Sequence, residues 1–262
     1  MDVLIKVSIV STMIVVGIFL LANLIIFRPI KYERLKYLIF FNKLKELTGS
    51  SKLIINDNIV TEQNILLDII YVRNRSSKKC FMLCHGNYGN ITNMINLIKL
   101  FYQYGSVVVF DYRGYGKSTG NRIDINFKNM ILDAVYVWNY IKTELKYKTV
   151  YLCGETMGSS VALGLTNILT KMNDKTELLI LINAYSNMDD IIKQKMGINM
   201  NLLSAFSNNF NNIIPFDNLE KTKIVLLNSE QNSNESSTLN LISNLNKYSS
   251  DISIIKIKFC PC

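Results

Sequence analysis

Short apolar runs alternate with longer stretches of helical periodicity from about Leu53 to the end of the chain. The expected strands are Ile54–Thr61, Ile65–Arg73, Lys79–Cys84, Ser106–Phe110, Thr149–Cys153, Leu178–Ile182, Lys223–Leu227 and Ile252–Phe259. The expected helices are Ile91–Tyr104, Phe127–Glu144, Ser159–Met172 and Ser237–Tyr248. Strands that alternate with helices of this length are typical of a mostly parallel sheet with helices on both faces. The sequence therefore predicts one α/β domain over residues 53–262.

The N-terminal part of the chain is expected to lie in a membrane. Val7 to Phe27 is a run of 21 residues without a charge. As a helix that rises roughly 1.5 Å per residue, it spans about 30 Å, the thickness of the hydrocarbon core of a bilayer. A signal peptide is the competing interpretation, but its apolar region is usually only about 7–15 residues and ends at a small-residue cleavage site. We therefore predict a retained single-pass anchor over residues 1–28.

Basic residues after the apolar run predict how the anchor is oriented. They are Arg28, Lys31, Arg34, Lys36, Lys43 and Lys45. The more basic flank of a membrane helix usually stays in the cytoplasm, so the domain is predicted to be cytosolic. Residues 29–52 are expected to form a juxtamembrane amphipathic linker. Its helix either lies along the membrane surface or packs on the domain, and the sequence does not decide between the two.

The composition argues against several other classes of protein. The net charge of +9 is scattered, with no basic patch interleaved with aromatic residues, so nucleic-acid binding ranks last among the hypotheses. The five cysteines are too sparse for a disulfide scaffold. Cys80 and Cys84 share one face of a strand but lack further metal ligands, and core packing is the better interpretation. No phosphate-binding glycine loop occurs. We therefore expect no cofactor and no metal.

Three glycine-containing segments follow expected strands, where open α/β sheets build their sites. They are His85–Asn90 (HGNYGN), Asp111–Ser118 (DYRGYGKS) and Gly154–Gly158 (GETMG). In this order and spacing the chain resembles the α/β-hydrolase superfamily, and in particular its membrane-anchored α/β-hydrolase domain proteins. The resemblance covers roughly Leu53 to Phe259. It implies an α/β-hydrolase fold in addition to the N-terminal transmembrane helix.

The resemblance implies a nucleophile elbow at the third segment. In this turn from strand to helix, Gly154 and Gly158 allow the backbone to approach its neighbours closely, and Thr156 occupies the nucleophile position. A backbone with positive φ is expected at that position. The N–H of Met157 lies at the start of the following helix, so it is expected to point at a developing oxyanion.

The first two segments supply the rest of the expected site. The resemblance implies that the N–H of Asn87 is the second oxyanion donor, and that His85 and Gly86 support this loop. The turn after the next strand is interpreted as structural, with Asp111 and Arg113 bracing it.

The sequence departs from the family at all three positions of the catalytic triad. Thr156 replaces the usual serine, and its β-branched side chain is disfavoured at positive φ. Gln231 stands at the position of the acid and cannot stabilise an imidazolium, although Glu230 or Glu235 would substitute if the loop shifts. The only histidine is His85, which is expected to be a packed loop residue rather than a base, and the chain ends without a histidine after the last expected strand.

Two functional hypotheses remain. The first is a membrane-anchored pseudo-hydrolase that retains an oxyanion-type pocket for an acyl or lipid-like ligand or a protein partner. The second is an active esterase or thioesterase, which acts on acylated lipids or proteins and uses Thr156 as its nucleophile. The second hypothesis needs a general base that the sequence does not supply.

Overall fold

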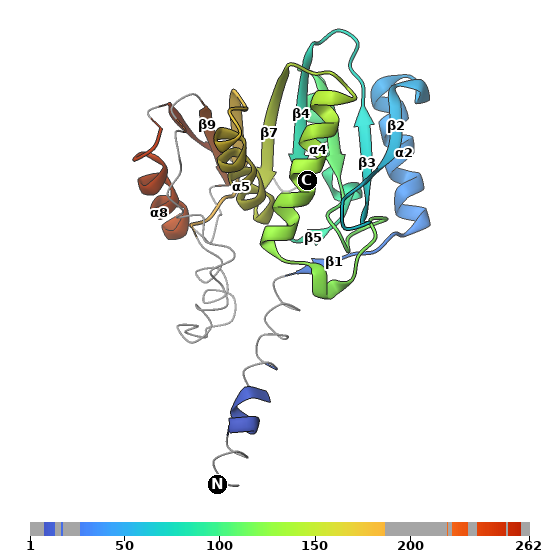
Figure 1. Ribbon diagram of the computed structural model, residues 1–262. Coiled ribbons are helices and arrows are strands. Elements are labelled where there is room, and N and C mark those ends of the chain that lie inside the picture. Colours follow the sequence, from blue (N-terminus) through green and yellow to red (C-terminus); the bar gives the residue numbers. More distant parts are fainter. Residues whose placement is uncertain are drawn as a thin grey trace.

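The computed structural model describes residues 8–13, 17, 27–186, 219, 222–229, 235–249 and 251–257. Its largest element is an eight-stranded sheet with the strand order β10-β9-β8-β7-β4-β6-β3-β2 (Figure 1). The strands are β2 (Ile54–Val60), β3 (Leu66–Val72), β4 (Lys79–Cys84), β6 (Ser106–Phe110), β7 (Thr149–Glu155), β8 (Leu178–Ile182), β9 (Lys223–Ser229) and β10 (Ile252–Ile257). β3 runs antiparallel to its two neighbours, β2 and β6, and the other neighbouring strands of this sheet pair in parallel. The predicted mostly parallel sheet is confirmed.

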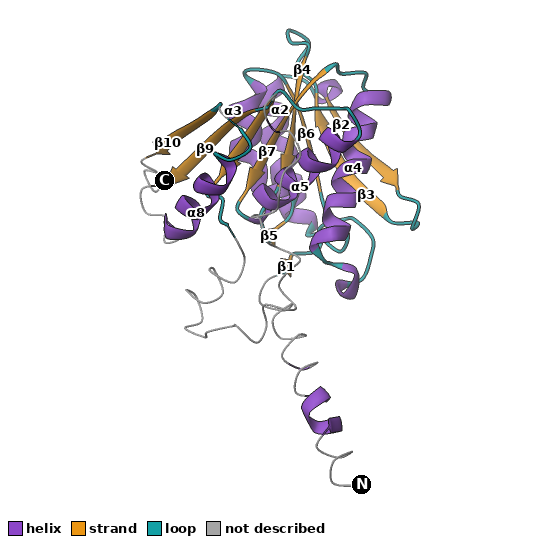
Figure 2. Cartoon of the chain, turned by 60° about the vertical axis from the view of Figure 1, so that its left-hand side comes forward, coloured by secondary structure: helices purple, strands orange, loops and turns teal. Residues whose placement is uncertain are grey.

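Helices cover both faces of the sheet, as Figure 2 shows. The α-helices among the described residues after residue 27 are α2 (Arg34–Thr48), α3 (Ile95–Tyr102), α4 (Phe127–Thr143), α5 (Met157–Lys171) and α8 (Glu235–Leu245). Short 3-10 helices are η1 (Ser51–Leu53), η2 (Ile91–Met94) and η3 (Arg122–Asp124). One core cluster joins the sheet to α4, α5 and α8, and a second joins its other face to α2 and α3.

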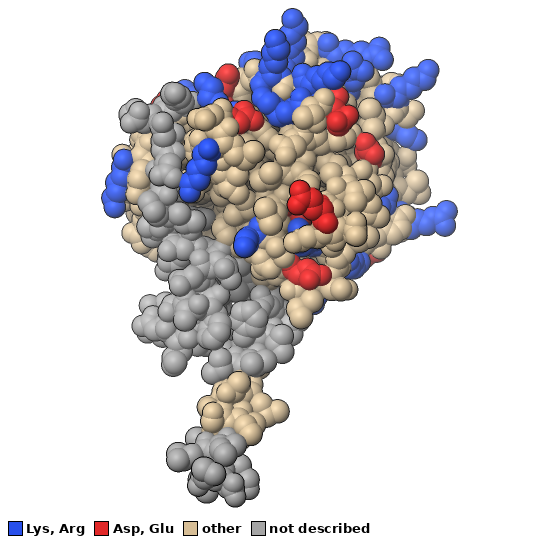
Figure 3. All heavy atoms as spheres, viewed as in Figure 1, with Lys and Arg blue, Asp and Glu red and all other residues tan. Residues whose placement is uncertain are grey.

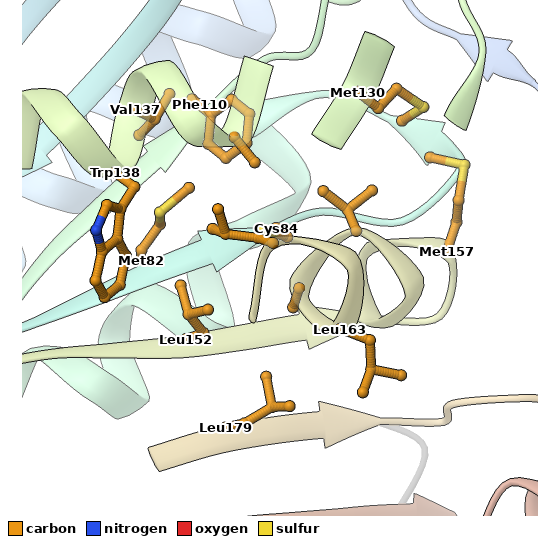
Figure 4. Packing of buried hydrophobic residues seen from close by; sticks show 14 of the residues in the cluster. Met82, Cys84, Phe110, Met130, Val137, Trp138, Leu152, Met157, Leu163 and Leu179 are labelled. Carbon is orange, nitrogen blue, oxygen red and sulfur yellow. The ribbon is translucent and has the colours of Figure 1, made fainter. Parts of the chain in front are cut away.

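The two cores follow from the alternation of side chains along each strand. In β4, Met82 and Cys84 belong to the first cluster, whereas Phe81 and Leu83 belong to the second. Figure 4 shows Met82 and Cys84 among the side chains of the first cluster, with Trp138 beside Met82. Burial on both faces explains why the central strands are continuous apolar runs rather than alternating ones.

Some element boundaries differ from those predicted. Gly154 was expected to break its strand, but β7 continues through Gly154 to Glu155 because the backbone there still pairs with β4 and β8. The helix α5 begins at Met157 rather than Ser159. The first turn of the helix expected from Ile91 is the 3-10 helix η2, which the Asn90 side chain caps.

The segment after the apolar run is built into the domain. The strand β1 (Arg28–Pro29) pairs in parallel with β5 (Tyr88–Gly89) in a separate two-stranded sheet. The helix α2 then buries Tyr37, Phe40 and Leu44 against the domain. The helix thus packs on the domain, and its predicted position along a membrane surface stays a prediction.

Most of the predicted anchor, Val7–Phe27, lies outside the described residues. Among the residues that are described, no helix is both long and apolar enough to cross a membrane. Residues 8–13 are helical, and their Ile9, Val10 and Met13 side chains are exposed. The transmembrane helix therefore stays a prediction.

Candidate functional site

Thr156 lies at the turn between β7 and α5 with φ 50° and ψ −111°. This is the positive φ that the resemblance implies for the elbow. Hydrogen bonds hold the turn from both sides, because Thr156 N donates to the Ile182 carbonyl (2.8 Å) and Ser159 N donates to the Thr156 carbonyl (3.0 Å). A β-branched residue in this region of backbone space is strained, so the surrounding structure has to enforce the conformation.

The two glycines of the elbow are required by close backbone contacts. A Cβ atom on Gly158 would lie 2.0 Å from the Cys84 carbonyl oxygen of β4. A Cβ atom on Gly154 would lie 2.3 Å from the Gly158 carbonyl oxygen. Both contacts are with backbone, which has little freedom to move. The spacing of Gly154 and Gly158 around Thr156 therefore reflects how tightly the elbow packs on the sheet.

The HGN loop lies directly against the elbow hydroxyl. A Cβ atom on Gly86 would be 2.6 Å from Thr156 Oγ1, so only glycine allows this approach. Gly86, Asn87 and Thr156 are all partly exposed. Met157 is the first residue of α5, and the N–H groups of the first helical turn have no partner within the helix. The structure thus brings together Thr156, Met157 and the HGN loop.

His85 holds the peptide group that carries the second expected donor. Its Nδ1 lies 2.8 Å from the Gly86 carbonyl oxygen. Because a carbonyl only accepts, this contact assigns the proton to Nδ1. The Gly86 carbonyl and the Asn87 N–H belong to one planar peptide and point in opposite directions. Because the Gly86 carbonyl points toward the His85 ring, the Asn87 N–H points away from that ring. This gives the predicted loop-supporting role of His85 a physical basis.

The His85 ring is buried beneath the loop and does not reach solvent. Its exposed fraction is 1%, and its ring centroid lies 4.4 Å from that of Tyr112 and 5.1 Å from that of Tyr115. Nε2 has no hydrogen-bond partner among the described residues and lies 3.6 Å from Asp111 Oδ1. Burial lowers the pKa of His85 to about 4. The imidazole is therefore neutral near pH 7, and its two nitrogens face Gly86 and Asp111.

Buried hydrogen bonds brace the turn that begins at Asp111. Asp111 Oδ1 accepts from Ile91 N (2.8 Å), and Oδ2 accepts from the Tyr37 hydroxyl (2.8 Å). Burial raises the pKa of Asp111 to about 7. Arg113 Nη2 lies 2.6 Å from Asp133 Oδ1, and both side chains are buried. This confirms the structural interpretation of the turn.

The acid position is only partly described. Gln231 and Glu230 lie outside the described residues, and of Glu235 only the backbone, at the start of α8, is described. Asn228, near the end of β9, has a buried Oδ1 that no hydrogen bond satisfies among the described residues. The predicted altered acid at Gln231 therefore stays a prediction.

The sequence did not single out three groups of the site. Tyr37 of α2 reaches Asp111, and Tyr115 donates to the Asn87 carbonyl (3.2 Å). Both contacts join segments distant along the chain, so no local pattern signals them. Glu155 precedes the elbow residue, and burial raises the pKa of its carboxyl group. Among the described residues Glu155 makes no hydrogen bond to Thr156. Cys80 and Cys84 are free thiols in the core, as interpreted from the sequence.

Comparison with known proteins agrees with this geometry. The profile of the family described as serine aminopeptidase, S33 matches residues 75–251. The uncharacterized protein R595 of Acanthamoeba polyphaga mimivirus is 37% identical over 222 residues, which cover 80% of this chain and 74% of the relative. The lysophosphatidylserine lipase ABHD12 of Gallus gallus is 33% identical over 116 residues, covering 43% of this chain but only 30% of that protein. The uncharacterized membrane protein YNL320W of Saccharomyces cerevisiae is 30% identical, and the match covers 46% of its length.

Solved structures support the same fold. The Pyrococcus furiosus esterase Pf2001 superposes with a TM-score of 0.64 at 19% identity, covering 82% of this chain and 84% of the esterase. An alpha-beta hydrolase from Vibrio vulnificus superposes with a TM-score of 0.66 at 15% identity, covering 88% and 89% of the two chains. At this level of identity the likeness concerns the fold alone.

Proposed function

This chain belongs to the serine aminopeptidase S33 family of α/β-hydrolases, and we propose that it is a membrane-anchored member whose hydrolytic mechanism is lost or strongly impaired. In this proposal it keeps an oxyanion-type pocket at the elbow. The pocket binds an acyl or lipid-like ligand without rapid turnover.

One observation carries the proposal: the single histidine of the sequence, His85, supports the HGN loop and does not lie free to act as a base for Thr156. A serine-type mechanism needs a base within hydrogen-bond reach of the nucleophile. His85 is buried, its Nδ1 is bonded to the Gly86 carbonyl, and its pKa of about 4 makes it a poor proton acceptor at neutral pH. The Thr156 hydroxyl makes no hydrogen bond to any described residue. A hydroxyl without a base is a weak nucleophile.

The parts that would bind a ligand are retained. The elbow has its positive φ, Gly86 lies against the Thr156 hydroxyl, and His85 orients the Asn87 peptide. Donors arranged in this way favour a carbonyl or carboxylate oxygen. The lysophosphatidylserine lipase among the relatives suggests a lipid-like ligand, and the membrane protein among them supports membrane association.

A second candidate function is slow ester or thioester hydrolysis by Thr156. Glu155 favours it, because this carboxyl group stands next to the elbow residue, has no partner among the described residues, and has a pKa raised by burial. A carboxylate with a raised pKa is a better base than an ordinary one. In this alternative Glu155 would accept the Thr156 proton after a change of side-chain rotamer.

Turnover of p-nitrophenyl esters by the full-length protein separates the two candidates. Esters from acetate to palmitate, and lysophosphatidylserine, should be hydrolysed no faster by the parent than by Thr156→Ala. Thr143→Ala, an exposed change in α4, serves as the control for the effect of mutation itself. Hydrolysis that is lost in Thr156→Ala, reduced in Glu155→Gln and kept in Thr143→Ala would reject the proposal and establish the alternative.

A further inference from the structure

We propose that the carboxyl edge of the sheet, which bears the elbow, rests directly on the surface of the phospholipid bilayer that holds the N-terminal segment. Tyr88 and Ile123 would be the side chains in contact with the lipid. This inference rests on the membrane anchoring that is part of the proposed function. It adds the direction in which the site faces.

The first support is that β1 joins the end of the apolar run to the HGN loop. Arg28 N donates to the Asn87 carbonyl (3.1 Å), and Ile30 N donates to the Gly89 carbonyl (3.3 Å). The Asn90 side chain donates back to the Ile30 carbonyl (3.2 Å). Figure 1 shows β1 beside β5 at one end of the domain. Arg28, the first residue after the apolar run, is therefore bonded directly to the loop that lies against the elbow.

The second support is that no free linker separates the apolar run from the domain. Phe27, the last residue of the run, is 2% exposed and belongs to the main core cluster. Its carbonyl accepts a hydrogen bond from Arg122 Nη2 (3.0 Å). A domain whose core contains the end of the anchor has to lie close to the bilayer surface, because every residue before Phe27 back to Val7 is uncharged.

The third support is the set of side chains around this point. Tyr88 pairs with Arg28 across the small sheet and is 61% exposed, and Ile123 follows Arg122 and is 84% exposed. The exposed Arg28 lies beside Tyr88 and would face lipid phosphates. Tyrosine and a flanking cation are typical of the membrane interface. On the face drawn in Figure 3, most Lys and Arg side chains gather at the far end of the domain, which would face water.

A site that faces the bilayer favours ligands that already reside in the membrane over ligands that are dissolved in water. An amphiphile that resides in the membrane would reach the elbow without crossing water, whereas a freely soluble ester would have to pass between the domain and the lipid surface. The ligand class that follows is an amphiphilic lipid that resides in the bilayer. This agrees with the lipid-like ligand of the proposed function, and it follows from the contacts of β1 and Phe27 together with the proposed anchoring.

Tryptophan quenching in the full chain tests the orientation. Trp138 is the only tryptophan and is 1% exposed, so it gives a constant background. The variants are Ile123→Trp and, as matched control, Tyr104→Trp, which is 62% exposed before β6 at the opposite edge of the sheet. Both are reconstituted in phosphatidylcholine vesicles with and without bromine on the acyl chains. Tyr88→Trp provides a second site at the carboxyl edge.

We expect brominated lipid to remove about half of the added fluorescence of Ile123→Trp and Tyr88→Trp, and to leave Tyr104→Trp unchanged. Equal quenching of all three, or none at the carboxyl edge, would overturn the inference even if the parent protein floats with the vesicles. A parent that does not float with the vesicles would overturn this inference together with the anchoring. Neither result bears on whether Thr156 hydrolyses esters, so failure here remains distinguishable from failure of the impaired mechanism.

Discussion

Replacing Thr156 with glycine should stabilise the folded protein, although removing a side chain usually does the opposite. Thr156 has φ 50° and ψ −111°. A non-glycine residue in so sparsely populated a region costs about 1–3 kcal/mol, and a β-branched residue is at the upper end. Glycine relieves this cost but adds about 0.5–1 kcal/mol of backbone entropy to be lost on folding. The free energy of unfolding should therefore rise by about 0.5–2 kcal/mol.

The matched control is Thr143→Gly, in the last turn of α4, where the backbone is helical and the side chain is exposed. Here glycine relieves no strain and lowers the free energy of unfolding by about 0.3 kcal/mol, the difference between the helix propensities of threonine and glycine. Urea unfolding of the full chain in detergent, followed by the fluorescence of the buried Trp138, measures both variants. A loss of stability in Thr156→Gly as large as in Thr143→Gly would refute the idea that the elbow is strained.

Three further predictions concern the packing and the charges around the site. Gly158→Ala should lower the free energy of unfolding by at least about 3 kcal/mol, or prevent folding, because its Cβ would meet backbone of β4. The control is Gly164→Ala on the same helix, whose Cβ meets only a flexible side chain. Its thermal unfolding should be close to that of the parent. Arg113→Met removes the ion-pair partner of the buried Asp133 carboxylate. In urea unfolding, the free energy of unfolding should fall by about 3–5 kcal/mol. Burial lowers the pKa of His85 to about 4, so acid weakens the fold below about pH 6.5, while the raised pKa of Asp111, about 7, has the opposite effect over the same range. Between pH 6.5 and 4.5 the free energy of unfolding of Asp111→Asn should therefore fall relative to that of the parent by about 2–3 kcal/mol, and equal profiles would contradict this assignment.

The fold was predictable because its signals are local. Central strands such as Lys79–Cys84 are continuous apolar runs, and the glycine spacing of the elbow reflects contacts that any such turn must make. The strand β7 was predicted to stop too early because a glycine usually weakens a strand, whereas here Gly154 is kept for the close approach of Gly158 and still pairs on both sides.

The site was predictable only where its residues follow strands that the sheet places side by side. The HGN loop and the elbow follow neighbouring strands, so their meeting follows from the topology of the sheet. The bond from Tyr37 to Asp111 and the pairing of β1 with the HGN loop join segments that are far apart in sequence. Such contacts depend on how the helices dock, and no periodicity encodes them.

Labelling with a fluorophosphonate probe tests the central claim most directly, because the probe reacts with a hydroxyl that a neighbouring base has activated. The full-length protein is treated beside an active serine hydrolase, and the peptide that contains Thr156 is examined by mass spectrometry. We predict no adduct on Thr156 under conditions that label the active enzyme completely. A stoichiometric adduct on Thr156 that disappears in Thr156→Ala would show that a base serves this hydroxyl, and it would contradict the loss of the mechanism.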